Sequence, residues 1–342
     1  MFVGIIGPLC AGKHSVAKWL ISNGFVHLGL KQRDQTGLET VFFDKSEDIL
    51  NYVTKHWAKN FVICNIESMR TLEMFKKRPF FMLIAVDSPI TTRYIRYVNR
   101  CRETNNSEPT IEEFITRSDC ELYNIAYPII DPSAHMNITI CANLNNHQCL
   151  KSPIINMMQM ANLNVINSYN SLFSLYEYLQ KINVINEERL RPSWDTYFMR
   201  MSDLAASRSN CMKRKVGCIL VKDCRVVATG YNGTPRGIKN CNEGGCQRCN
   251  DAVPCGLDLD VCLCLHAEEN ALLEAGRDRV SSGCILYCNT CPCLRCTVKL
   301  VQAGVKEVVY NLSYGMDDKT AKLLKEAGVI LRQHTAKNIC DY

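Results

Sequence analysis

The chain has 342 residues, of which 47% are hydrophobic and 22% charged, and this is the composition of a folded globular protein of about two domains. It excludes a largely disordered, collagenous or coiled-repeat chain. Forty Lys and Arg residues against 34 Asp and Glu residues give a net charge of +6 at pH 7. A surplus this small argues against a dedicated nucleic-acid-binding protein, but it leaves room for a local basic pocket that binds a phosphate.

Cysteine is unusually frequent, with 21 residues, and its distribution is uneven. Eleven of these cysteines crowd into one stretch: Cys241, Cys246, Cys249, Cys255, Cys262, Cys264, Cys284, Cys288, Cys291, Cys293 and Cys296. Such crowding favours metal ligation over a disulfide framework. Residues 1–20 carry no secretion signal, and no stretch offers about 18 consecutive apolar residues. We therefore expect no membrane association and a reducing compartment, the cytoplasm, with the nucleus as a second location.

The first half of the chain, taken as a domain over residues 1–185, alternates short apolar runs with amphipathic helical patterns. Strands are predicted at 2–7, 25–30, 60–66, 80–87 and 137–141, and helices at 14–22, 46–57, 68–77, 90–101, 110–123 and 171–181. This alternation is typical of a parallel α/β sheet. Asparagine recurs between 143 and 170, which predicts a surface excursion that interrupts the domain.

A second domain, taken as residues 190–342, has a different order of elements. A helical face begins at Trp194 and is followed by two strands joined by a tight turn and by a loop rich in Gly, Cys and Asn. The predicted elements are strands at 216–221 and 226–231, the loop 232–265, a helix at 266–275, a strand at 283–288, a helix at 292–303, a strand at 306–311, a helix at 317–327 and a strand at 328–332.

Two short motifs in this second domain carry the chemistry. His266-Ala267-Glu268 is followed, 26 residues after the histidine, by Pro292-Cys293-Leu294-Arg295-Cys296. Together they match the H-x-E…P-C-x-x-C signature of zinc deaminases. One imidazole and two thiolates supply three ligands to tetrahedral Zn²⁺ and leave the fourth position for water, which is typical of a catalytic site.

The spacing within the first motif indicates where the metal lies. Glu268 follows His266 by two residues, and two helical steps are about 200° apart, so the two side chains do not share a helix face. We therefore expect the zinc to lie beyond the helix end, where His266 binds it and Glu268 reaches the same water as a proton carrier. His266, Cys293 and Cys296 all come near predicted helix N-termini, where the helix dipole favours a thiolate.

Three segments resemble the deoxycytidylate (dCMP) deaminase family: Gly230–Gly237, His266–Ala271 and Thr290–Cys296. The resemblance implies a cytidine-deaminase-like α/β/α sandwich that hydrolyses dCMP to dUMP and ammonia and so supplies thymidylate synthesis. It also implies a homo-hexamer that dCTP activates and dTTP inhibits, with Asn232 in contact with the nucleotide. A plain Asn-Gly turn is the alternative interpretation of Asn232.

The cysteine-rich loop predicts a second, structural zinc site. Three ligands are expected from Cys241, Cys246 and Cys249, and the fourth from Cys255, Cys262 or Cys264. Of these three, Cys264 is assigned as the fourth ligand. Spacing does not choose among these three residues, and free or partly paired thiols are the alternative.

The N-terminal sequence Gly7-Pro8-Leu9-Cys10-Ala11-Gly12-Lys13 follows the P-loop pattern up to its lysine, between a predicted strand and a helix. His14 stands where the pattern has Ser or Thr, and Ser15 comes one position late, so the magnesium ligand of the pattern is not in its usual place. This half resembles the dephospho-coenzyme A and nucleoside-monophosphate kinases, and fungal dCMP deaminases carry an extension of this type. A working kinase and a scaffold with degenerate nucleotide binding are both open, and the departure at His14 favours the scaffold.

Three alternatives to dCMP deamination are kept: a zinc deaminase of a free nucleoside, one that acts on RNA or single-stranded DNA, and a non-catalytic zinc-binding interaction module. A polynucleotide substrate calls for a basic channel with interleaved aromatic residues, and the second domain has isolated basic residues instead. We therefore expect no nucleic-acid partner. Arg208, Arg236 and Lys239 are open candidates for holding the substrate phosphate.

Overall fold

The computed structural model describes residues 1–31, 38–64, 66–125, 128–129, 138–139, 153–254, 257–280, 283–313 and 317–335. The chain divides into two compact units between Arg191 and Pro192. Within the described residues, no helix has both the length and the apolar character needed to cross a membrane.

A six-stranded parallel sheet forms the centre of the first unit, in the order β3-β2-β4-β1-β5-β8. Its strands are β1 (Phe2–Ile6), β2 (Val26–Leu30), β3 (Thr40–Phe43), β4 (Phe61–Cys64), β5 (Phe81–Asp87) and β8 (Leu163–Ile166). The helices are α1 (Lys13–Ser22), α2 (Ser46–Lys55), α3 (Met69–Lys76), α4 (Ile90–Glu103), α5 (Ile111–Tyr123), α6 (Ile154–Met158) and α7 (Leu172–Lys181). The prediction of a parallel α/β sheet is confirmed.

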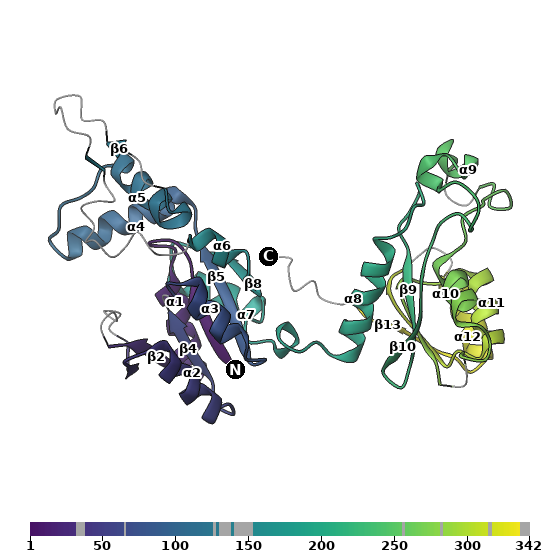
Figure 1. Cartoon of the computed structure of the whole chain (residues 1–342), viewed down its shortest axis with the longest axis horizontal. Coiled ribbons are helices and arrows are strands. Elements are labelled where there is room, and N and C mark those ends of the chain that lie inside the picture. The colour runs from purple at the N-terminus through teal and green to yellow at the C-terminus, as the bar shows by residue number, and fades with distance from the viewer. Residues whose placement is uncertain are drawn as a thin grey trace. The chain divides into compact units, whose positions relative to one another are not determined.

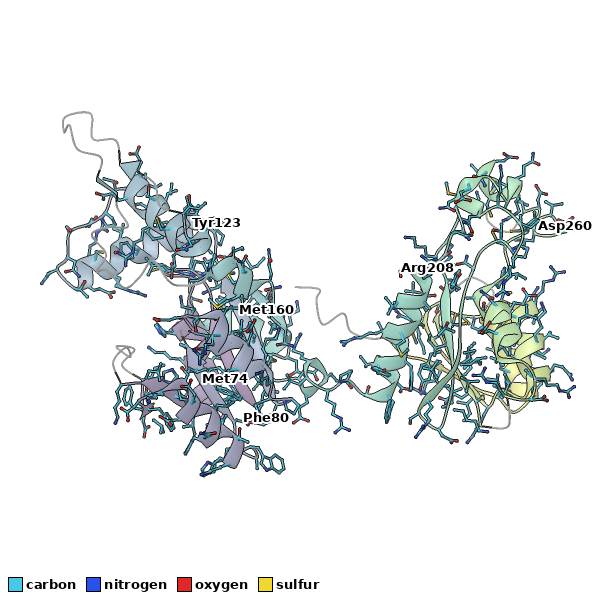
Figure 2. The ribbon with its side chains drawn as sticks, viewed as in Figure 1. Met74, Phe80, Tyr123, Met160, Arg208 and Asp260 are labelled. Atoms are coloured by element: carbon cyan, nitrogen blue, oxygen red, sulfur yellow. The ribbon has the colours of Figure 1, made fainter. Side chains whose placement is uncertain are left out.

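Each face of this sheet carries its own apolar core. On one face α1 and α7 bury residues such as Leu20 and Leu179, and on the other α2, α3 and α6 bury Ile49, Leu72 and Met157. Strands buried on both faces read as continuous apolar runs, which is why β1 and β5 were predictable from sequence. Figure 2 labels Met74, Phe80 and Met160, three half-buried side chains that pack against the second of these cores.

Two predictions for the first unit are wrong. The run at 137–141 does not join the parallel sheet, because β7 (Ile138–Thr139) pairs antiparallel with β6 (Pro128–Ile129) in a separate two-stranded sheet. The edge of the main sheet is filled instead by β8, which lies inside the stretch predicted to be a surface excursion. Leu163 and Val165 of β8 are buried in the core, while Asn164 and Ile166 are exposed. This short alternation was hidden among the asparagines.

The second unit is a five-stranded mixed sheet between two helical layers, in the strand order β10-β9-β11-β12-β13. Its strands are β9 (Gly217–Lys222), β10 (Arg225–Tyr231), β11 (Ile285–Thr290), β12 (Glu307–Leu312) and β13 (Ile330–Gln333). The longer helices are α8 (Trp194–Ala206), α10 (Ala267–Ala275), α11 (Leu294–Ala303) and α12 (Asp317–Glu326), and the cysteine-rich loop adds the short helices η3 (Cys241–Glu243) and α9 (Gln247–Asn250). This is the predicted order of elements.

Figure 1 shows α8 on one face of this sheet and α10, α11 and α12 on the other. The predicted α/β/α sandwich is therefore confirmed. Gly230 of β10 allows the close approach of α10, because a Cβ there would lie 2.0 Å from the Ala267 carbonyl oxygen. The sequence thus brings the helix that follows His266 directly onto the sheet.

A charged network ties the start of α8 to the sheet. Arg332 of β13 donates to both carboxylate oxygens of Asp195, at 2.6 and 3.0 Å, and to Glu307 at 2.9 Å. Tyr287 of β11 donates to the same Asp195 at 2.8 Å. The hydrogen bonds from Arg332 lower the pKa of Asp195, so this aspartate stabilises the fold above its unfolded pKa of about 4.

Replacing this arginine, as Arg332→Met, is therefore expected to lower the free energy of unfolding at pH 7. We expect a loss of about 1 to 2 kcal/mol, modest because the guanidinium is 40% exposed. The difference from wild type should shrink as pH falls below about 4, because protonation of Asp195 removes the same interaction. Thermal unfolding followed by circular dichroism at pH 7 and pH 3 measures both effects. The exposed Arg225→Met variant is the control, and an equal loss at both pH values would contradict the assignment.

Candidate active site

His266 occupies the N-cap position of α10, with an extended backbone at φ −77° and ψ 156°. Its side chain therefore points away from the helix body, while Glu268 lies inside the first turn. This arrangement agrees with a metal site beyond the helix end, which stays a prediction.

The two cysteines of the second motif lie at the start of α11. Cys293 is the N-cap residue and Cys296 lies within the first turn. The sulfur of each cysteine lies 3.4 Å from Nδ1 of His266. All three ligand atoms lie within 4.8 Å of one another, so the structure brings together the three side chains that were predicted to bind the catalytic zinc.

The electrostatics of this trio favour a metal ion. A hydrogen bond from Cys296, with His266 as a further partner, lowers the pKa of Cys293 to about 4. One thiolate is therefore present at neutral pH, and metal binding displaces the second thiol proton. One nitrogen and two sulfur atoms fit Zn²⁺ and leave a coordination position open for water. Of the three ligand residues, His266 is exposed, Cys293 is half-buried and Cys296 is buried.

Glu268 is a buried carboxyl group at the edge of this site. It is only 3% exposed, and it lies near two fully buried thiols, those of Cys218 on β9 and Cys288 on β11. Burial raises the pKa of Glu268 above the usual range of a glutamate. A carboxyl group with a raised pKa can both accept and return a proton, which is the requirement for a general acid and base.

Asn232 begins the loop after β10 and is almost entirely buried. Its Oδ1 accepts hydrogen bonds from Ser209 Oγ at 2.7 Å and from the Val216 amide at 2.8 Å, and its Nδ2 donates to the Arg214 carbonyl at 2.8 Å. These bonds fix the loop to the start of β9, and they leave one Nδ2 hydrogen for a ligand. Contact between Asn232 and the nucleotide stays a prediction. In addition, the hydrogen bonds of Asn232 position the loop that follows β10.

The cysteine-rich loop differs from its prediction. The structure divides the proposed quartet, because Cys241 groups with Cys211, Cys249 and Cys264, whereas Cys246 groups with Cys249, Cys262 and Cys264. The predicted set of Cys241, Cys246, Cys249 and Cys264 is corrected accordingly, and Cys255 lies outside the described residues. Cys211 was missed because it lies 30 residues before Cys241 and follows α8, so only the fold brings it to the loop.

The three basic candidates for phosphate binding all lie on or next to the loops around Asn232. Arg208 follows the end of α8 (Figure 2) and is exposed, as are Arg236 and Lys239. All three side chains face solvent, and the structure does not choose among them.

In the first unit, the residues of the predicted P-loop connect β1 to α1. Gly7 and Gly12 have φ of 152° and 102°, and a Cβ at Gly7 would lie 1.9 Å from the Val86 carbonyl oxygen, so these positions need glycine. Lys13 Nζ donates to the carbonyls of Gly7 at 2.6 Å and Pro8 at 3.1 Å. The Glu121 carboxylate accepts from the Leu9 amide at 2.8 Å. The loop is therefore held by groups of the chain itself.

These features define a zinc-dependent deaminase. The fold is an α/β/α sandwich, and two neighbouring helices present a histidine and two cysteines at their starts, beside a buried glutamate. Residues 192–312 match the family described as the cytidine and deoxycytidylate deaminase zinc-binding region.

Comparison with relatives along the whole chain narrows the class of deaminase. Over 340 residues the chain is 48% identical to the deoxycytidylate deaminase of Schizosaccharomyces pombe, with 97% of each chain covered. It is 41% identical over 334 residues to that of Saccharomyces cerevisiae, covering 97% of this chain and 96% of that one. A crystal structure of the dCMP deaminase from cyanophage S-TIM5 in apo form is 32% identical, covers 42% of this chain and 99% of its own, and has a TM-score of 0.34.

The chain belongs to the deoxycytidylate deaminase family. It is a hydrolase whose catalytic cofactor is zinc, and the alternative of a non-catalytic zinc-binding module is thereby removed.

Proposed function

We propose that this enzyme hydrolyses dCMP to dUMP and ammonia, and so supplies dUMP for thymidylate synthesis. The observation that carries the proposal is the buried Glu268 carboxyl beside the trio of His266, Cys293 and Cys296. The names of the two relatives that match nearly the whole chain support the choice of dCMP as substrate.

The reaction requires movement of protons as well as an attacking water. Deamination replaces the exocyclic amine at C4 of cytosine by an oxygen from water, so protons pass from that water to the ring nitrogen and to the departing ammonia. Zinc, when bound by His266, Cys293 and Cys296, supplies acidification of the water.

Glu268 is proposed to move these protons. It accepts a proton from the water and returns it to the substrate, and its burial keeps the carboxyl group away from bulk solvent, which would otherwise exchange the proton. Asn232, held by its hydrogen bonds to Ser209 and Val216, is proposed to donate its remaining amide hydrogen to the nucleotide.

An ultraviolet assay with dCMP, cytidine, dCTP and a tRNA stem-loop in parallel tests the substrate. We expect turnover of dCMP, with kcat/KM for cytidine at least about 100-fold lower, because a site that pairs with a phosphate is left with unpaired polar groups when the phosphate is missing. Comparable turnover of cytidine or of the RNA would overturn the choice of dCMP while leaving the zinc chemistry intact.

We also propose a homo-hexamer that dCTP activates and dTTP inhibits. Exposed apolar side chains on α8, namely Trp194, Tyr197 and the 71% exposed Leu204, support self-association. In the same assay dCTP should lower, and dTTP raise, the dCMP concentration at half-maximal rate, and light scattering should give the mass of six chains. We also propose a reducing compartment, the cytoplasm with the nucleus as a second location, because no disulfide joins Cys293, Cys296 or the cysteines of the cysteine-rich loop that the structure describes.

For the first unit we propose a kinase-like scaffold whose phosphate loop is degenerate. The loop follows β1, which lies between β4 and β5, and the carboxyl edge at such a reversal of strand order is where α/β sheets bind ligands. Lys13 and the Leu9 amide, however, are engaged by the chain itself, and His14 replaces the magnesium ligand.

Substitution of the loop lysine, Lys13→Ala, is therefore expected to leave deamination of dCMP unchanged. Isothermal titration should detect no ATP binding up to about 1 mM in either wild type or variant, because the Glu121 carboxylate already accepts from the Leu9 amide, a donor of the phosphate loop. Tight ATP binding by wild type that the variant loses would contradict the scaffold and favour a working nucleotide site.

A further inference from the structure

Six cysteines of the second unit converge into one small cluster that is separate from the catalytic trio. Cys241, Cys246 and Cys249 are buried, and Cys211, Cys262 and Cys264 pack against them. They come from three parts of the chain: the segment after α8, the η3–α9 region, and the segment just before His266. The loop between α9 and α10 that carries two of them also carries Asp260, labelled in Figure 2.

The sulfur atoms have the spacing of metal ligands rather than of disulfides. Cys249 Sγ lies 3.9 Å from the sulfurs of Cys211, Cys262 and Cys264. Cys246 Sγ also lies 3.9 Å from the sulfur of Cys262. A disulfide requires about 2.05 Å. Tetrahedral zinc with Zn–S bonds of about 2.3 Å holds its sulfurs about 3.8 Å apart, which is the observed spacing.

The cluster contains two complete sets of four ligands, not one. In each set, all sulfurs lie within 4.8 Å of one another. One set is Cys211, Cys241, Cys249 and Cys264, and the other is Cys246, Cys249, Cys262 and Cys264. Cys249 and Cys264 belong to both sets. A single zinc ion would use one set and leave two neighbouring thiols, one buried and one half-buried, without a role.

We propose that these six cysteines bind two zinc ions, with Cys249 and Cys264 each bridging both ions. Each ion then has four sulfur ligands and no open position, which is the arrangement of a structural site. Six thiolates and two Zn²⁺ ions leave two negative charges uncompensated. The guanidinium of Arg248 lies beside Cys249 and Cys262, and the Met212 amide donates to Cys241 Sγ at 3.4 Å, so positive charge and donors are supplied locally.

The cluster connects directly to the catalytic segment. Cys264 precedes His266 by two residues, and Leu265 between them exchanges two backbone hydrogen bonds with Gly233, at 2.8 and 3.2 Å. Asn210, next to Cys211, accepts hydrogen bonds from the amides of Thr234 and Cys241, both at 3.4 Å. Zinc at the cluster would therefore fix the loop after Asn232 against the segment that presents His266. This positioning role rests on the proposed function, whereas the metal assignment does not.

Zinc content of the purified full-length chain, measured by plasma mass spectrometry, tests the assignment without any substrate. We expect three zinc ions per chain, one at the catalytic trio and two in the cluster. The double variants Cys211→Ser/Cys241→Ser and Cys246→Ser/Cys262→Ser should each lose one zinc, since each pair serves one ion only. The exposed Cys224→Ser is the matched control and should keep all three.

A single four-cysteine site predicts a different pattern. Wild type would then hold two zinc ions, and one of the two double variants would keep both, which would overturn the proposal. Should the double variants fail to fold, X-ray absorption of the wild-type protein decides the question. A zinc–zinc scattering contribution is expected from thiolate-bridged ions, and its absence would exclude the shared ligands.

Discussion

Replacing the buried carboxyl group, as Glu268→Gln, should reduce kcat for dCMP by about 10³- to 10⁴-fold while the zinc content and the unfolding temperature stay near those of wild type. The amide preserves the size and hydrogen-bonding shape of the side chain but carries no transferable proton, so the loss is confined to the chemical step. Because Glu268 is 3% exposed, no outside group replaces it easily.

Steady-state assays together with zinc analysis measure this effect. Glu274→Gln, on the exposed side of the same helix, is the matched control and should retain normal kcat. Residual activity of Glu268→Gln within about tenfold of wild type would show that another group carries the proton, and would leave the zinc site itself unaffected.

The substitution Cys296→Ala should abolish deamination together with one zinc ion per chain. Cys296 is buried at the start of α11 and supplies one of only three protein ligands, so its removal should lower the zinc affinity by more than the about 10- to 100-fold typical of losing a hydrogen-bond partner of a ligand. Added zinc should restore little activity in the variant. In wild type that has been stripped with a chelator, added zinc should restore full activity.

The comparison variant is Cys224→Ser, because this thiol is exposed and lies in the turn between β9 and β10. It should keep its metal and its kcat. A Cys296→Ala protein with a full zinc complement and normal turnover would mean that the catalytic metal is held elsewhere.

Local sequence patterns were sufficient for the catalytic trio. His266, Cys293 and Cys296 lie at helix starts, and the identity and position of a helix start are encoded by neighbouring residues. The two-residue step from His266 to Glu268 also predicted a metal site beyond the helix end, and the structure gathers the three candidate ligands there. Local patterns did not predict how the strand at 137–141 pairs, and they missed β8. Whether a short strand joins a sheet depends on the neighbouring strand at the edge of that sheet and not on its own few residues.

The cysteine-rich loop shows the limit most clearly. Sequence spacing indicated a sulfur-rich metal site but grouped Cys241 with Cys246, and it left out Cys211 altogether. Which thiols meet is decided by how η3, α9 and the segment before His266 pack against the segment that follows α8. These contacts join residues up to 53 positions apart along the chain, as from Cys211 to Cys264.

For Asn232 the sequence showed the motif but not what the side chain does in the fold. The structure engages its Oδ1 with Ser209 and Val216, so much of what this residue does is to hold the loop. By itself the sequence determined the class of fold and the helix starts, and it predicted the catalytic ligands, because each of these is indicated by short local patterns. Only the tertiary structure decided the edge strand β8, the burial of Glu268 and the two overlapping cysteine sets, because burial and ligand geometry arise from distant segments packed together.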